Sequence, residues 1–179
     1  MRFLTSLHCL IALLLSISVV ACAPMVPRTV NTAPLSNSNV TVRMVNPDQF
    51  AELRQNRNFG DIRDGSWLVE LQEHVVDRAG RRLAPGQQLD VNITDIKRAG
   101  DFEPWRGPNF NDIRVVKEIY PPRIDLNYVL KDSNGSVIRE GSDELTDLAF
   151  LRRIVRNDTD PLRFEKRLID DWLGKILPL

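Results

Sequence analysis

Apolar and polar residues alternate along several short segments of the chain, a pattern typical of β-strands whose two faces meet different surroundings. The pairs Asn46-Pro47 and Pro85-Gly86 are turn-forming and border the first two segments, and the turn at 132–135 contains Asn-Gly, a strong hairpin signal. The predicted strands cover residues 40–45, 89–94, 113–119 and 124–130, with a fifth beginning near Val137.

Two further segments have the apolar period of a helix. Residues 62–79 place their apolar side chains within one arc of a helical wheel and stop at Gly80, a common helix end. Residues 161–177 follow Asp160-Pro161, an N-cap and a first-turn proline, and again share one apolar face. The resulting fold class is α+β: a mainly antiparallel sheet of four to five strands with two helices packed on one face. The strands at 40–45 and 89–94, which flank the first helix, are expected to be parallel if they neighbour each other.

One charged residue interrupts the apolar face of the second helix. Glu165 projects into the middle of that face, where a carboxylate needs a partner or solvent. Arg114 and Arg123 are the basic residues that the sequence offers as partners.

The connection at 97–111 has no predicted secondary structure and is longer than compact domains usually contain. One interpretation is a packing loop held by its aromatic residues and shaped by its prolines and glycines. The other is a recognition surface, extending to residue 123, in which aromatic faces and charged groups contact a partner. The predicted partner-binding residues are Glu103, Trp105, Arg106, Tyr120 and Arg123.

The same stretch also contains carboxylates that a small hydrolase could use as an acid–base pair. Glu103 with Asp112, or Asp95 with Asp101, are the candidate pairs. Their separation cannot be derived from sequence, so hydrolysis stays the alternative to binding.

Composition excludes several classes of function. Lys plus Arg equals Asp plus Glu at 24 each, whereas nucleic-acid binders usually carry a basic stripe, so we expect no nucleic-acid partner and interpret the small cluster of Arg152, Arg153 and Arg156 as solvated surface. Cys9 and Cys22 both lie in or next to the N-terminal apolar segment, and His74 is the one histidine beyond it. We therefore predict no disulfide, no thiol nucleophile, no metal site and no cofactor.

The N-terminus resembles a bacterial lipoprotein signal peptide: Arg2, an apolar run, and then Val19-Val20-Ala21-Cys22. We predict a signal peptide at 1–21, acylation of Cys22, a disordered tether within 22–39 and a single domain at 40–179. Ala23 after the cysteine implies transport to the outer membrane, with the domain facing the periplasm. Cleavage after Ala23 to give a soluble periplasmic protein, or retention of the run as an anchor, are the alternatives.

Specific blocks within residues 40–175 resemble a known family. The segments GDFEPWRGPNF, DIRVVKEIYPPRIDL, LTDL and DPLRFEKRLIDDW are similar to the domain of unknown function 3016 family of proteobacterial envelope proteins. This resemblance implies export and brings no known catalytic residues. The expected function is that of a lipid-anchored envelope module that binds or assembles with a protein or a cell-wall glycan; a small periplasmic hydrolase is the alternative.

Overall fold

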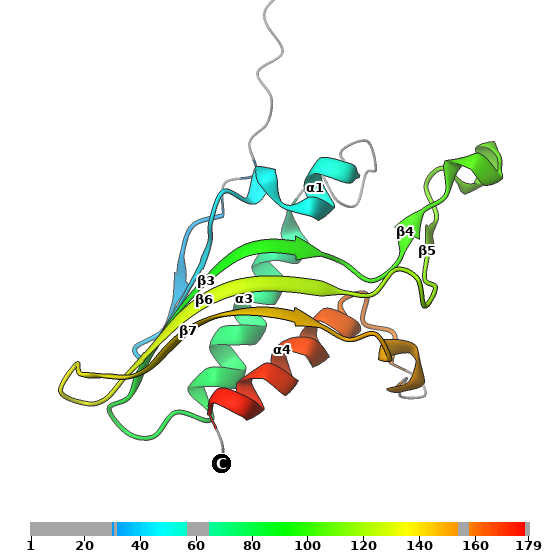
Figure 1. Cartoon of the computed structure of the whole chain (residues 1–179). Helices are drawn as coiled ribbons and strands as arrows, with labels where there is room; N and C mark the ends of the chain where they lie inside the picture. Colours follow the sequence, from blue (N-terminus) through cyan, green and yellow to red (C-terminus); the bar gives the residue numbers. More distant parts are fainter. Residues whose placement is uncertain (1–29, 31, 57–64, 154–157, 178–179) are drawn as a thin grey trace, which may run out of the picture.

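The computed structural model describes residues 30, 32–56, 65–153 and 158–177. Its centre is a five-stranded sheet of order β1-β2-β3-β6-β7, in which only β2 and β3 are parallel (Figure 1). The α+β class and the parallel pair are confirmed. The strands are β1 Leu35–Ser36, β2 Val40–Met44, β3 Gln88–Lys97, β6 Arg123–Lys131 and β7 Val137–Thr146.

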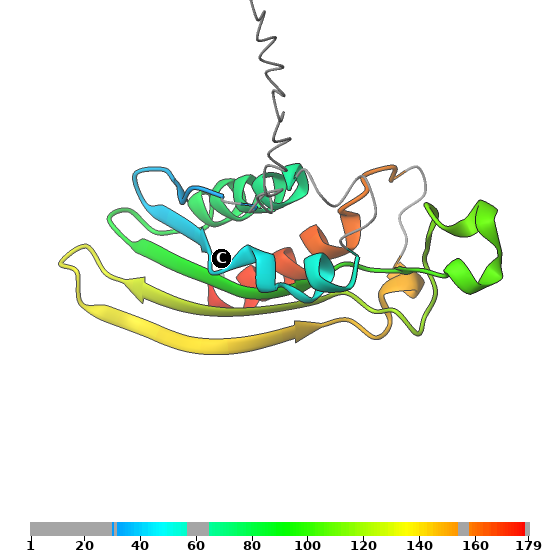
Figure 2. The same ribbon diagram turned by 90° about the horizontal axis from the view of Figure 1, so that it is seen from above.

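Two helices cover one face of this sheet, as the sequence predicts. Helices α3 (Ser66–Gly80) and α4 (Arg163–Ile176) form a second layer, visible edge-on in Figure 2. Shorter helical segments, η1 (Pro47–Gln49), α1 (Ala51–Gln55) and η4 (Phe150–Arg153), lie in the connections. The predicted start of the first helix at 62–64 lies outside the described residues. Across the described ranges, no helix is both long enough and apolar enough to cross a bilayer.

The core forms between the sheet and the two helices because strand residues alternate between the two faces. Side chains that point to the helices are buried, whereas the residues between them on β6 are exposed or half-buried. Tyr128 of β6 meets Trp172 of α4 edge to face, with ring centroids 5.5 Å apart. The inward-facing residues of β2, β3 and β6 are Val40, Val42, Met44, Leu89, Val91, Ile93, Ile96, Ile124, Leu126, Tyr128 and Leu130.

The strand predicted at 113–119 is wrong. Only Arg114–Val115 form a strand, β5, and it pairs with β4 (Asp101–Phe102) in a separate two-stranded sheet. After β5 the chain turns, since the Tyr120 N–H donates to the carbonyl of Lys117 at 3.0 Å. Two prolines, which have no N–H to donate to a sheet, follow that turn.

β3 continues beyond the predicted end at residue 94 through an irregularity. The register with β6 shifts between Ile93 and Asp95, as in a β-bulge, so one extra residue enters the strand. Ile96 therefore points into the core, while Asp95 accepts a hydrogen bond from the Ala51 N–H at 2.5 Å. The shift breaks the alternation from which the strand was predicted.

The folded part begins before the predicted boundary at residue 40. β1 pairs with β2 through Leu35 and Ser36, and the side chain of Gln72 donates to the carbonyl of Ala33 at 3.2 Å. The Val30 N–H donates to Asp48 at 2.9 Å. The second half of the predicted tether is thus attached to the domain, whereas the predicted signal peptide and Cys22 lie outside the described residues.

Candidate functional site

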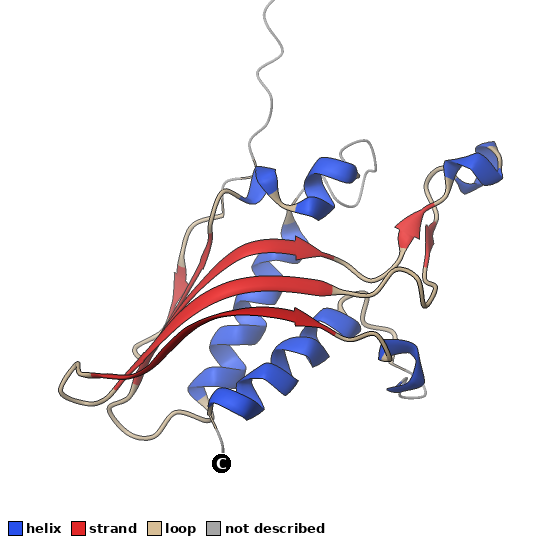
Figure 3. Cartoon of the chain, in the orientation of Figure 1, coloured by secondary structure: helices blue, strands red, loops and turns tan. Residues whose placement is uncertain are grey.

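An arm extends from one end of the sheet, built by the residues between β3 and β6. We define the arm as residues 101–116, containing β4, two single helical turns, η2 (Pro104–Arg106) and η3 (Pro108–Phe110), and β5 (Figure 3). Gly100 allows the chain to enter it, with φ of +82° and an N–H that donates to the carbonyl of Tyr120 at 3.0 Å. A β-carbon there would lie 2.9 Å from the carbonyl of Val115.

Glu103 is the centre of a hydrogen-bond cluster inside the arm. Its side chain is buried, with 2% of the residue exposed, and its carboxylate accepts from Lys117 Nζ at 2.6 and 2.8 Å. The Tyr120 hydroxyl donates to it at 3.1 Å, and Arg106 lies at 3.4 Å. The cluster connects η2 to the turn from Lys117 to Tyr120, which follows the arm.

Electrostatics hold this cluster in one protonation state. The hydrogen bond from Lys117 lowers the pKa of Glu103, with further lowering from Tyr120 and Arg106. Desolvation raises the pKa of Tyr120, as does the carboxylate to which its hydroxyl donates. Glu103 is thus a carboxylate and Tyr120 a phenol at neutral pH, and the pair acts as internal bracing. Binding of a partner by these two residues stays a prediction.

Arg114 ties the base of the arm to the body. Its guanidinium bonds Glu52 of α1, donates to the carbonyl of Gly100 at 3.1 Å and lies 4.8 Å from the ring centre of Phe102. Glu52 is fully buried and also accepts from the Arg98 N–H at 3.0 Å. The ammonium of Lys97 lies 3.3 Å from the same carboxylate, so these three groups fix its position.

The two predicted arginine partners do not hydrogen-bond Glu165, although the charge of Arg114 opposes the increase that desolvation causes in the pKa of this carboxyl. Arg114 bonds Glu52 instead, and Arg123 donates to Asp95 at 2.7 Å, which raises the pKa of that arginine. Glu165 accepts from the N–H of Ala99 at 2.6 Å, and its second oxygen has no hydrogen-bond partner within the described part of the chain. One oxygen of this carboxylate thus accepts from a backbone N–H at the base of the arm. No pattern of side chains in the sequence reveals such a donor.

Burial of Glu165 predicts a pH dependence of stability. Desolvation raises the pKa of Glu165, so the folded state binds its proton more tightly than the unfolded state, and stability falls as pH rises between the two pKa values. Glu165→Gln cannot ionise and should lose this dependence. We expect thermal unfolding to show a variant more stable by about 1 to 3 kcal/mol near pH 8, with the difference shrinking towards about pH 4. A constant difference across this range would contradict the assignment.

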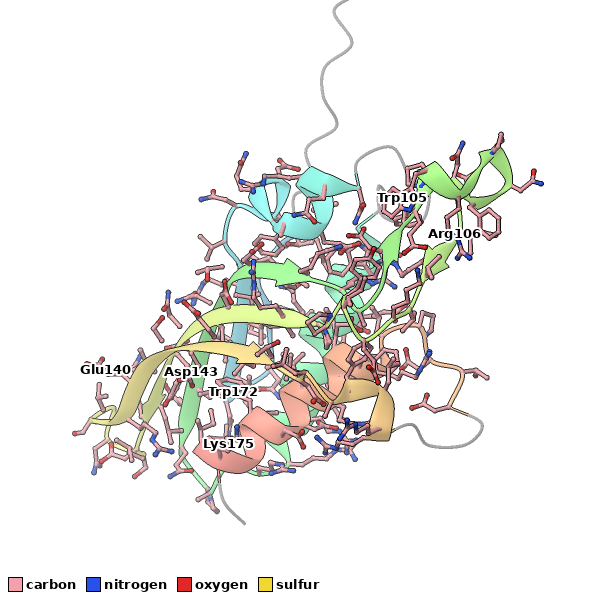
Figure 4. All side chains as sticks on the ribbon, turned by 45° about the vertical axis from the view of Figure 1, so that its right-hand side comes forward. Trp105, Arg106, Glu140, Asp143, Trp172 and Lys175 are labelled. Carbon is pink, nitrogen blue, oxygen red and sulfur yellow. The ribbon has the colours of Figure 1, made fainter. Side chains whose placement is uncertain are left out.

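Trp105 and Arg106 are the predicted residues that face outward from the arm (Figure 4). Trp105 is 72% exposed although it is the largest apolar side chain of the arm. Arg106 lies over the ring of Phe110, with its guanidinium carbon 4.8 Å from the ring centre. Of the five predicted binding residues, these two form an accessible pair, while Glu103 and Tyr120 lie behind them and Arg123 belongs to the sheet.

Three of the four candidate hydrolytic carboxylates contact basic side chains. Glu103 is held by Lys117, whereas Asp112 is exposed on the turn after η3. Asp95 accepts from Arg123, and Asp101 lies 3.4 Å from Lys97. These contacts account for three of the four carboxylates, and no observation assigns the pairs a hydrolytic role.

Sequence reasoning missed a hollow of about 300 Å³ along the β7 edge of the sheet, between β7 and the end of α4. Trp172 donates its indole N–H to Asp143 at 2.9 Å there, and Arg139 donates to the carbonyl of Lys175 at 3.1 Å. Figure 4 shows Asp143, Trp172 and Lys175 well away from Trp105. The available signal was that β7 is polar on both faces, which is typical of an edge strand.

Together the fold and the arm define a small α+β protein, a helix-covered sheet that displays an exposed aromatic residue on a braced extension. A family model described as "Protein of unknown function (DUF3016)" matches residues 38–175. The chain belongs to that family, as its sequence blocks indicate.

No curated protein matches the chain. Among solved structures, a minor lipoprotein from Acinetobacter baumannii is similar at 12% identity, covering 80% of this chain and 90% of that one. Its TM-score of 0.25 is too low to support an argument about fold or function.

Proposed function

We propose that this chain is a lipid-anchored protein of the bacterial cell envelope that binds or assembles with a partner through its arm. In this proposal Cys22 carries the lipid, the domain faces the periplasm from the outer membrane, and the partner is an envelope protein or a cell-wall glycan. A soluble periplasmic form is the alternative for its location.

The exposure of Trp105 on a braced arm is the observation that carries the proposal. An aromatic side chain left in water costs hydrophobic stabilisation, which favours a contact that covers it. The arm is fixed at its base by the Glu52–Arg114 pair and internally by Glu103, so Trp105 is presented from a preorganised support. Preorganisation lowers the entropy lost on binding. Trp and Arg, both represented among the exposed residues of the arm, are among the residue types most enriched at interface hot spots.

The length of chain before the domain supports a position near the membrane. Val30, the first of the described residues, lies eight residues after Cys22. At about 3.3 to 3.6 Å per residue, this stretch reaches roughly 28 Å at most. An anchored domain would therefore stay within about its own diameter of the lipid headgroups.

We expect Trp105→Ala to remove partner capture without unfolding the protein. A photo-crosslinking residue in place of the exposed Asn109 should trap the partner in living cells, and Trp105→Ala should reduce this product about tenfold or more. The melting temperature should change by less than about 2 °C, as is usual for an exposed side chain.

Incubation of the same variants with purified cell-wall sacculi separates a glycan from a protein partner. Loss of many degrees of melting temperature in Trp105→Ala would make the residue a packing element and contradict the binding role. Unchanged capture by both assays would contradict it as well.

The anchor is tested by Cys22→Ser. This change should abolish labelling with radioactive palmitate and release the protein from the membrane fraction, since the acceptor thiol is lost. Cys9→Ser is the matched control, because it removes a thiol upstream of the predicted cleavage site, and it should leave labelling intact. Density-gradient separation of the two membranes then tests the outer-membrane location. Labelling that survives in Cys22→Ser would rule out the anchor.

A further inference from the structure

The two edges of the main sheet are protected very differently. β1 ends one side with two residues, whereas β7 ends the other with ten, Val137–Thr146, and contains no proline. Within the described residues β7 pairs with β6 alone, and Figure 2 shows its outer edge uncovered. A long unpaired edge is a template for another strand.

Hydrogen bonds across the sheet show which backbone groups β7 leaves free. The Leu89 N–H of β3 donates to the carbonyl of Asn39, beside β2, at 2.9 Å. The next residue, Asp90, therefore turns its backbone towards β6, where its partner is Val129. Because neighbouring residues alternate, Tyr128 turns its backbone groups away from β3 and towards β7.

Tyr128 pairs with Gly141, so the backbone groups of Gly141 are used within the sheet. Alternation then leaves the N–H and C=O groups of Glu140, Ser142 and Glu144 pointing to the open edge. All three of these residues are exposed. The middle of β7 thus presents a regular set of unpaired donors and acceptors.

The side chains of β7 also divide into two sets. Arg139 and Asp143 lie on the helix side, where they contact Lys175 and Trp172. Glu140 and Ser142 lie on the opposite side, level with Val129 and Asn127 of β6. On the helix side, an added strand would thus meet the guanidinium of Arg139 and the carboxylate of Asp143. On the opposite side it would meet the carboxylate of Glu140 and the hydroxyl of Ser142.

We propose that β7 pairs antiparallel with β7 of a second copy, with the two-fold axis at Gly141. This register places Arg139 opposite Asp143 of the second copy, twice by symmetry, on the helix side. On the other side Glu140 lies opposite Ser142 of the second copy. Opposite charges at directly facing positions stabilise a strand pair.

Charge excludes the neighbouring registers. Two residues that face each other must both point their backbone groups to the open edge or both point them away, and their side chains must lie on the same side of the sheet. The two-fold axis can therefore pass only through a residue and not between two residues. An axis at Ser142 places Glu140 opposite Glu144, and an axis at Glu140 or Asp143 places that carboxylate opposite itself. An axis at Arg139 places two guanidinium groups together. Like charges at facing positions destabilise a strand pair, which leaves Gly141.

The pairing would give one continuous sheet with an arm at each distant end. In Figure 4 Trp105 lies at the opposite end of the molecule from Glu140. The arms would stay accessible, so two tips could engage one extended partner with higher avidity than a single tip. This inference concerns β7 alone and does not depend on the proposed function.

Cysteine crosslinking tests both the pairing and its register. The described residues contain no cysteine, and the unsubstituted full-length chain, which keeps Cys9 and Cys22, gives the background for the introduced thiols. Two differently tagged full-length copies, one carrying Glu140→Cys and the other Ser142→Cys, should form a disulfide-linked dimer after mild oxidation of cells. Facing α-carbons about 5.5 Å apart are within disulfide reach. Either variant expressed alone should give about a tenth of this product or less. In this register its cysteine faces an unsubstituted residue of the second copy, so the two thiols do not lie opposite each other.

Charge exchange provides a second measurement. Arg139→Asp, added to both copies, should reduce crosslinking about tenfold, because a difference of 1.4 kcal/mol suffices for that factor. Arg139→Asp in one copy with Asp143→Arg in the other should restore it, since every facing pair is again opposite in charge. Melting temperatures verify that these variants fold.

Absence of crosslinks in the mixed cells, or equal crosslinks in either single variant, would overturn the proposal. Crosslinks from Ser142→Cys to a different protein would assign the edge to another partner and overturn it too.

Discussion

Replacing Glu52 with alanine is expected to lower the free energy of unfolding by about 3 to 5 kcal/mol, the cost of removing one member of a buried ion pair. The carboxylate is fully buried and bonds Arg114, Lys97 and the backbone N–H of Arg98. Its loss leaves the guanidinium and the ammonium without their shared anion. At about 2 to 4 °C per kcal/mol, the melting temperature should fall by roughly 6 to 20 °C.

Glu118→Ala is the matched control for Glu52. It removes the same side chain from an exposed position that follows the arm, so stability should change by less than about 0.5 kcal/mol. Denaturant unfolding of both variants gives the comparison. Equal stability of the Glu52 variant and the parent would show that the base of the arm does not depend on this carboxylate.

Trp172→Ala is expected to cost about 3 to 5 kcal/mol as well, because it removes a large side chain from the core. Trp172 is 2% exposed, packs edge to face with Tyr128 and donates to Asp143. Aromatic pairs add about 0.5 to 1.5 kcal/mol beyond their buried area, and the carboxylate would lose its donor. The expected decrease in melting temperature is again roughly 6 to 20 °C.

Trp105→Ala makes the same chemical change at a residue that is 72% exposed. The two tryptophan variants should therefore separate by at least about 2 kcal/mol in thermal or denaturant unfolding. Similar losses in both would mean that the arm packs as part of the core in solution.

The two main helices and four strands of the sheet could be predicted because each has one face in a common core. That arrangement repeats apolar residues at the helix or strand period, as in β6, whose buried and exposed residues alternate. β1 has only two residues, too short to show a period. The segment 113–119 is rich in β-branched residues, yet the Lys117–Tyr120 turn and the prolines after it redirect the chain away from the main sheet.

The sequence indicates which residues lie together in the candidate site, but it does not indicate which of them face solvent. The sequence places Glu103, Trp105 and Arg106 together, but which of them faces solvent depends on Lys117 and Tyr120, which return from the far side of the arm. Likewise, the partner of Glu165 is a backbone N–H, and backbone groups are the same at every non-proline residue. Contacts of this kind need the folded chain to be seen.

The attachment of β1 has a mechanical consequence. A pulling force along an anchored N-terminus would reach the domain at Val30 and then at β1, which has two residue pairs with β2. β2 is held by five pairs to β3 and would resist longer. The chain released between residue 30 and β2 would span at most about 33 to 36 Å, at about 3.3 to 3.6 Å per residue, while the core stays folded. Under such a force β1 would therefore detach first, and the strands from β2 onward would stay paired.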